Sequence, residues 1–106
     1  MKKELIISKK SIEMDAILEY YLVEDMYKDE NTIAPVYGVH ISLVRNGRAE
    51  SCETVNDISC CAATVEKFIF LLSENDVAPA TLFDIVSDKM AEGFFEPQPE
   101  RIWQIA

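Results

Sequence analysis

The first half of the chain alternates apolar and polar positions at the spacing of β-strands. Segments 17–27 and 36–45 are rich in β-branched and aromatic residues, and the second of them alternates most clearly. Segment 5–8 is a short candidate strand, and segment 48–55 is another. We therefore expect four strands, with the charged segment 28–31 as the turn between the second and the third.

Asn46-Gly47 separates the third and fourth expected strands and indicates a two-residue hairpin, because a type I′ turn needs positive φ at both central residues. This loop predicts that His40 lies opposite Glu53. Side chains alternate between the two faces of a sheet. The predicted core face therefore holds Tyr37, Val39, Ile41, Leu43 and Cys52. The predicted polar face holds His40, Ser42, Ser51 and Glu53.

In the second half of the chain the apolar positions take helical spacing. Steps of 4, 3, 4 and 3 residues join Ile58, Ala62, Val65, Ile69 and Leu72. Ser59 is the expected N-cap of this helix. A second helix is expected to start at Pro79 and to end at Gly93, with a buried stripe of Leu82, Ile85, Val86 and Met90.

These patterns predict an α+β fold, in which an antiparallel sheet of about four strands is followed by two α-helices packed on one face. Residues 1–106 read as a single domain. Within it, the strand-rich half spans 3–55 and the helical half spans 57–93. A proline-interrupted C-terminal tail covers 94–106.

Composition narrows the function classes. The net charge is −9, and residues 49–106 carry eleven acids against three bases. An acidic chain is a poor match for a phosphate backbone, so we expect no nucleic-acid partner. Three glycines cannot supply a phosphate-cradling glycine loop, and one histidine cannot supply a multi-histidine metal site. No cofactor and no metal site are therefore expected.

Targeting signals and cysteine usage favour the cytoplasm. The first apolar run is only three residues long and stops at Lys9-Lys10, which is too short for a secretory signal. The longest apolar run, 68–72, is far too short to span a bilayer, so no membrane partner is expected. The three cysteines are odd in number and two are adjacent, which favours reduced thiols.

Four short segments together resemble a known family. They are 21–24 (YLVE), 37–41 (YGVHI), 55–59 (VNDIS) and 82–86 (LFDIV). Their order is similar to that in a family of small, acidic, uncharacterised proteins of clostridia and related Gram-positive bacteria, a domain of unknown function. The resemblance implies a cytosolic single-domain protein, and it carries over no activity and no catalytic residue.

Candidate catalytic residues do not converge in the predicted hairpin. His40 beside Ser42 and opposite Glu53 has the composition of a triad, but an open sheet face offers no oxyanion hole. Cys52 is expected on the opposite face from His40, where it packs as a small hydrophobe. We therefore expect no catalytic residues and no enzymatic activity.

Cys60 and Cys61 fall in the first turn of the first expected helix. A helix N-terminus lowers the pKa of a thiol, which makes both residues candidates for redox sensing, whereas the acidic surroundings and the adjacent apolar stripe favour plain packing. Asp84, Asp88 and Glu92 recur at four-residue spacing along one helix face. They could bind a cation or form a solvated face, and the solvated face needs no further explanation.

The aromatic tail directs the functional hypothesis. Phe94, Phe95, Ile102 and Trp103 are candidate interaction residues, because large apolar side chains either fold onto the core or anchor interfaces. The sequence therefore favours a non-enzymatic protein-interaction or self-associating module, forming a homodimer or binding another protein. The alternative is a small ligand-, metal- or redox-sensing regulator that uses Cys60 and Cys61.

Overall fold

The computed structural model describes residues 1–95 and has the expected α+β architecture. Four antiparallel strands form one sheet in the order β1-β2-β3-β4. The strands are β1 (Lys2–Ser11), β2 (Ala16–Lys28), β3 (Ile33–Arg45) and β4 (Arg48–Ser59). They are followed by α1 (Ala62–Glu74), the 3₁₀ turn η1 (Pro79–Thr81) and α2 (Leu82–Ala91).

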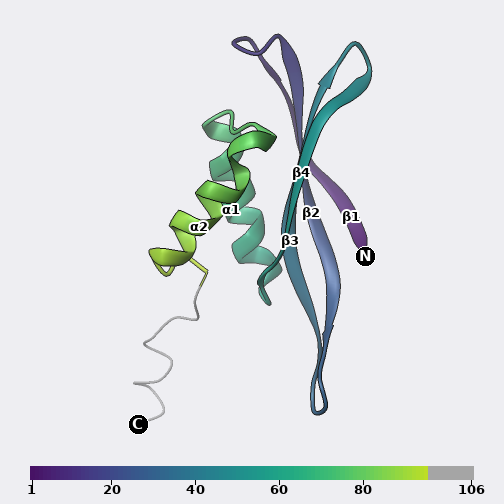
Figure 1. Cartoon of the computed structure of the whole chain (residues 1–106), viewed down its shortest axis with the longest axis vertical. Coiled ribbons are helices and arrows are strands. Elements are labelled where there is room, and N and C mark those ends of the chain that lie inside the picture. The colour runs from purple at the N-terminus through teal and green to yellow at the C-terminus, as the bar shows by residue number, and fades with distance from the viewer. Residues whose placement is uncertain (96–106) are drawn as a thin grey trace.

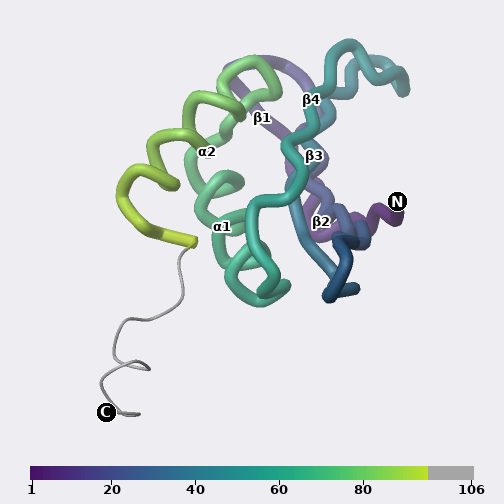
Figure 2. The backbone as a smooth tube through the Cα atoms, turned by 60° about the horizontal axis from the view of Figure 1, so that its bottom comes forward, coloured from purple at the N-terminus to yellow at the C-terminus, as the bar shows by residue number. Residues whose placement is uncertain are grey.

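Both helices lie on the same side of the sheet, which leaves the other side bare (Figure 1; Figure 2). Figure 1 views the sheet from its edge, with α1 and α2 to its left. The core lies between these two layers. Its buried strand residues are Leu18, Tyr20, Leu22, Val39, Ile41 and Leu43, and its buried helix residues are Val65, Phe68, Ile69, Leu72, Leu82 and Val86. The apolar stripe of α1 thus meets the inward side chains of the two central strands, whereas α2 lies against β4. Leu82 and Val86 of α2 are buried as expected, but Met90, predicted in the same stripe, is 44% exposed because it lies near the end of the helix.

Tyr20 ties the sheet to the loop between the helices. Its ring is fully buried, and its hydroxyl donates a hydrogen bond of 2.9 Å to the carbonyl oxygen of Val77. Burial, aided by the nearby Asp76 carboxylate, raises the pKa of Tyr20 well above its usual value. The phenol therefore stays protonated and serves as a donor inside the core.

The first helix begins later than the periodicity predicts. Cys61, not Ser59, is the N-cap residue of α1, and β4 continues as far as Ser59. Ile58 is therefore a strand residue, although it is buried in the core as its place in the apolar pattern predicts. The expectation failed because Ile58 lies at a strand-to-helix junction, where either period can bring a side chain to the core.

The second helix ends as expected. Gly93 follows the helix with φ at +77°, and its backbone N–H donates to the carbonyl oxygen of Met90. The N–H of Phe94 donates to the carbonyl oxygen of Lys89. These two bonds form a Schellman motif, which needs a residue with positive φ just beyond the helix. The motif turns the chain back, so that Phe94 and Phe95 lie against α1.

The predicted register of the β3–β4 hairpin is wrong beyond its first two pairs. The turn does fall at Asn46-Gly47, and Arg45 pairs with Arg48 as expected. A register shift then follows between Leu43 and Val44, because Glu50 is an extra residue on β4. A bulge of one residue moves every later side chain of the bulged strand to the opposite face.

The bulge changes the cross-strand partners of His40 and Ser42 and the face on which three residues of β4 lie. His40 lies opposite Thr54 rather than Glu53, and Ser42 lies opposite Cys52. Cys52 therefore shares a face with His40, and it is exposed rather than part of the core. Ser51 and Glu53 move to the side of the helices. The expected places of Tyr37, Val39, Ile41 and Leu43 on the core face are confirmed.

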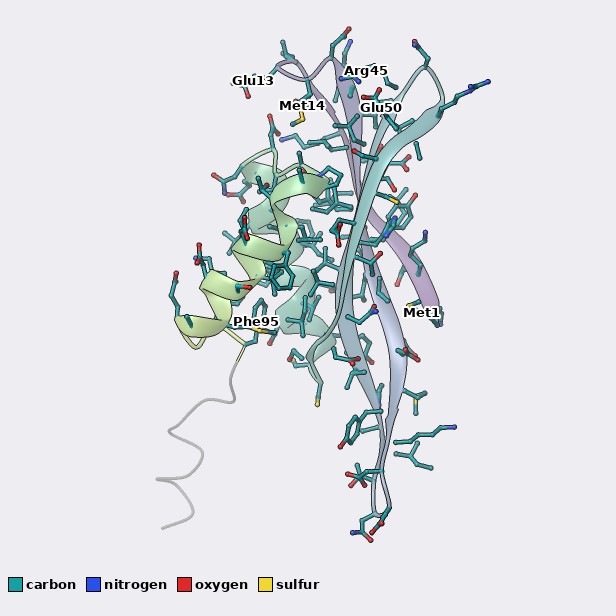
Figure 3. All side chains as sticks on the ribbon, viewed as in Figure 1. Met1, Glu13, Met14, Arg45, Glu50 and Phe95 are labelled. Atoms are coloured by element: carbon teal, nitrogen blue, oxygen red, sulfur yellow. The ribbon has the colours of Figure 1, made fainter. Side chains whose placement is uncertain are left out.

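Arg45 links the bulge to the neighbouring turn. Its guanidinium forms an ion pair with the carboxylate of Glu50 and donates a hydrogen bond of 2.6 Å to the carbonyl oxygen of Met14. Figure 3 shows Arg45, Glu50 and Met14 gathered at one end of the sheet. The extra residue on β4 is thus fastened to the turn between β1 and β2.

A second irregularity in β4 depends on Gly38. A Cβ atom at this position would lie 2.2 Å from the carbonyl oxygen of Val55 and 2.9 Å from Cα of Asn56. The next residue of β4, Asp57, has φ at +55°. The backbone of β4 therefore passes so close to Gly38 of β3 that only glycine fits there. Beyond this close approach, β4 leads toward α1.

Candidate functional site

The side of the sheet away from the helices is the main surface that the fold leaves uncovered, and we call it the open face. Its residues follow from strand alternation and the observed register. They include Lys3, Leu5 and Lys10 of β1, Ile17, Glu19, Tyr21 and Val23 of β2, His40 and Ser42 of β3, and Cys52 and Thr54 of β4.

His40 occupies the middle of the open face and is nevertheless 8% exposed. Its Nδ1 lies 2.6 Å from Oγ1 of Thr54, and its Nε2 lies 3.0 Å from Oγ of Ser42. The Tyr21 ring covers its edge at a centroid distance of 5.4 Å. Both ring nitrogens are thus satisfied by hydroxyl groups, each of which can donate or accept.

Lys3 completes a row of side chains that crosses the sheet from β1 to β4. Its ammonium nitrogen lies 5.0 Å from the centroid of the Tyr21 ring, within the range of a cation–π contact. The hydroxyl of Tyr21 donates to Oε1 of Glu19 at 2.9 Å. This bond, together with burial, raises the pKa of Tyr21. Tyr21 thus stands between Lys3 and His40 and contacts both.

The electrostatics around His40 favour a neutral imidazole. Burial lowers the pKa of His40, and the nearby Lys3 ammonium lowers it further, whereas Glu53 acts weakly in the opposite direction. Lys3 takes part in none of the salt bridges within residues 1–95, which join Lys9 to Asp76, Arg45 to Glu50 and Lys89 to Glu92. Lys3 therefore brings an ammonium group without a salt-bridge partner to this part of an otherwise acidic chain.

A small pocket of about 230 Å³ lies at this row of side chains. It is lined by Met1, Lys3, Val23, His40 and Thr54. Figure 3 places Met1 on the side of the sheet opposite to the helices and to Phe95. The lining combines two apolar side chains with an ammonium group, an imidazole and a hydroxyl, and it includes no carboxylate.

Cys60 and Cys61 lie before α1 and not in its first turn as the sequence suggests. Cys61 is the N-cap residue with extended backbone angles, and its backbone N–H donates to Oγ of Ser59 at 3.0 Å. Both side chains are exposed, as is that of Cys52. The helical spacing predicted a helix from Ile58, which would have included both cysteines, but Ile58 belongs to β4 and α1 starts at Ala62.

The acidic side chains of α2 do not form a cation site. Asp84, Asp88 and Glu92 are all exposed, and Glu92 accepts a hydrogen bond of 3.4 Å from the Lys89 ammonium group. Across residues 1–95, no three His, Cys, Asp or Glu side chains come close enough together to hold a metal ion. The three carboxylates form a solvated face of the helix.

Of the candidate interaction residues, two lie within the described chain. Phe94 and Phe95 are half-buried, and their ring centroids lie 5.9 Å and 5.0 Å from that of Phe68. They therefore pack on α1 rather than on the open face of the sheet. Ile102 and Trp103 lie outside the described residues.

The sequence pattern missed Lys3, Tyr21 and Thr54 as neighbours of His40. Strand alternation supplies part of the signal, because Tyr21 lies directly opposite His40 in the pairing of β2 with β3. Thr54 could not be found without the bulge at Glu50, whose carboxylate pairs with Arg45, which in turn donates to the carbonyl oxygen of the distant Met14.

Comparison with known proteins gives a family without an assigned activity. The model of the family of unknown function DUF6514 matches residues 2–92, which span every strand and helix. The match confirms the expectation of an uncharacterised domain. No curated protein and no solved structure matches the chain. Within the described residues, no helix is long and apolar enough to cross a membrane.

Proposed function

Because the chain belongs to the DUF6514 family, whose function is unknown, we propose a role from its own surface: a non-enzymatic module that self-associates through its open face. The occupant of this face is a second copy of the same chain. The observation that carries the proposal is a sheet face that neither helix covers (Figure 1) and on which the apolar side chains of Leu5 and Ile17 stay exposed.

The sequence of the central strands supports a second covering layer. A strand with one solvated face alternates apolar and polar residues, whereas a strand buried on both faces is apolar throughout. Segment 20–23 of β2 (YYLV) is apolar at four consecutive positions. Leu5 and Ile17, also on the open face, remain 48% and 42% exposed. Packing of a second sheet on this face would remove their side chains from water.

Charge favours a second copy of the chain as that layer. The open face carries Lys3 and Lys10 against Glu19 and Asp25, a net charge of zero, whereas the whole chain carries −9. Two copies of an acidic protein therefore repel each other least when these faces meet. A two-fold interface would bring the same residues together from both copies.

The area of the face indicates a reversible dimer. Four strands spaced about 4.8 Å apart and about ten residues long present about 600 Å². A stable interface buries about 800 Å² on each partner, and weaker, transient interfaces bury less. We therefore expect a reversible rather than an obligate dimer.

Sedimentation velocity over a concentration series tests the proposal. The wild type should shift toward twice the monomer mass as its concentration rises. Ile17→Lys should remain monomeric, because it places a second lysine beside Lys10 on the open face, and packing would bury both charges. Phe83→Lys is the matched control. It adds the same charge at a position that is 63% exposed on α2, and it should associate like the wild type.

Two outcomes would overturn the proposal. The wild type could remain monomeric up to about 1 mM, a concentration at which an association free energy of about 4 kcal/mol is detectable. Alternatively, Phe83→Lys could abolish the association while Ile17→Lys leaves it intact. That result would place the interface on the helices.

A further inference from the structure

We infer that the pocket at Lys3 and His40 binds a small carboxylate that carries a short aliphatic chain. The inference does not depend on self-association of the protein. It rests on three features of the described residues: an ammonium group without a salt-bridge partner, a hydroxyl that one tautomer of the neighbouring imidazole leaves able to donate, and two apolar side chains beside them.

Lys3 supplies the charge. Its ammonium group faces the Tyr21 ring and takes part in none of the ion pairs between residues 1–95. The open-face carboxylate nearest in the register, Asp25, accepts a hydrogen bond from the backbone N–H of Met26, and the next one, Glu19, accepts the hydroxyl proton of Tyr21. Lys3 also lowers the pKa of His40, so the two basic groups act on each other across the pocket. Because this shift keeps His40 neutral, an anion in the pocket would pair with the Lys3 ammonium group.

The bonds of His40 determine how Thr54 can take part. When the Ser42 hydroxyl donates to Nε2, the proton of the neutral imidazole resides on Nδ1 and is donated to Oγ1 of Thr54. The hydroxyl proton of Thr54 is then free to be donated into the pocket. In the other tautomer, that proton is bound by Nδ1. A bound carboxylate would accept the Thr54 proton and thereby select the Nδ1–H tautomer.

The apolar part of the lining selects among anions. Val23, which is 2% exposed, forms the wall beside the polar groups, and Met1, which is 81% exposed, lines the pocket with it. A carboxylate with three or four carbons places its charge at Lys3 and its chain against this wall. The volume of about 230 Å³ is below the usual range for drug-sized ligands, which restricts the ligand to a few heavy atoms.

NMR of the single histidine tests the inference, with sodium butyrate as the probe. Butyrate is added to Ile17→Lys, which should stay monomeric and keep the open face accessible, and the ring signals of His40 are followed. We expect saturable shifts within about 50 mM, as suits a ligand of about six heavy atoms. We also expect a shift of the ¹⁵N signals toward the Nδ1–H tautomer.

Two lysine variants provide the matched comparison. Lys3→Gln removes the charge in the pocket and should weaken butyrate binding at least about tenfold, a change typical of losing one partly desolvated charge contact. Lys10→Gln removes a lysine from the same strand and the same face but outside the pocket, and its dissociation constant should stay within about twofold of the parent.

Three results would overturn the inference. The first is shifts that do not saturate. The second is equal weakening by Lys3→Gln and Lys10→Gln, which would indicate general attraction of anions to the strand. The third is inorganic phosphate binding as tightly as butyrate, which would show that charge alone is recognised. If Ile17→Lys behaves like the wild type in sedimentation, self-association through the open face is refuted. The butyrate titration then still shows whether the pocket binds a carboxylate.

Discussion

Gly38 offers the most direct test of the observed path of β4. Its Cα hydrogens point at the backbone of β4, and a methyl group there would lie 2.2 Å from the carbonyl oxygen of Val55. The second obstructing atom, Cα of Asn56, also belongs to the main chain. Rotation of a side chain cannot relieve either contact. Gly38→Ala must therefore displace β4 from β3 or leave a severe overlap.

The size of the effect follows from known costs of overpacking. Extra methyl groups in a well-packed region destabilise a protein by about 1–3 kcal/mol. We expect about 3 kcal/mol for Gly38→Ala, because the obstructing atoms are main-chain atoms. For a domain of this size, each kcal/mol lowers the melting temperature by about 4–8 °C, so the expected decrease is about 12–24 °C.

Thermal and urea unfolding measure this loss, and Gly47→Ala is the control. Gly47 lies in the turn just before β4. A Cβ atom added there would have nothing within 4 Å, so only the φ of +76° disfavours alanine at this position. A non-glycine residue with such a positive φ lowers the free energy of unfolding by about 1–2 kcal/mol. If Gly38→Ala is no less stable than Gly47→Ala, β4 does not cross at Val55. The register that places Thr54 beside His40 would then be wrong as well.

Three further substitutions test other contacts. Tyr20→Phe removes the buried hydrogen bond to Val77 and should lower the free energy of unfolding by about 1–3 kcal/mol in urea denaturation, and an unchanged value would contradict the bond. Burial lowers the folded-state pKa of His40 below its unfolded value of 6.5. The neutral imidazole therefore contributes fully to the free energy of unfolding above that pH, and this contribution is lost as the pH falls. Between about pH 7 and about pH 5 the wild type should therefore lose more stability than His40→Gln, and parallel curves would refute this reasoning. Phe95→Ala should cost about 1–3 kcal/mol by thermal unfolding, less than a fully buried ring, and the exposed control Phe83→Ala should cost almost nothing.

Local pattern was sufficient to predict the elements and their layers. The alternation in segment 36–45 and the helical spacing of segment 62–72 each depend on neighbours within a few residues, and both were confirmed. Gly93 could be predicted as the end of α2 for the same reason, because the Schellman motif involves only adjacent residues. Because each of the two consecutive helices has an apolar stripe to bury, both were predicted on the same face of the sheet.

The register of β4 could not be predicted, because a tertiary contact sets it. Nothing in segment 46–52 marks Glu50 as an extra residue. Its place becomes fixed when Arg45 binds both Glu50 and the carbonyl oxygen of Met14, about thirty residues earlier in the chain. This one residue changed the partner of His40 from a carboxylate to a hydroxyl. The candidate site therefore changed from an exposed ion pair to a buried, neutral imidazole.

Self-association and anion binding should be linked, because the pocket lies within the open face. Packing two open faces together would remove both Lys3 ammonium groups from water, and an unpaired charge is costly to bury. A carboxylate bound beside each Lys3 would offset this penalty, so each dimer should take up two anions. By reciprocity, an anion that binds the dimer more tightly than the monomer also strengthens dimerisation. Sodium butyrate should therefore raise the dimer fraction of the wild type in sedimentation, and it should have no such effect on Lys3→Gln. A decrease in the dimer fraction of the wild type would show instead that the anion and the second copy compete for the same surface.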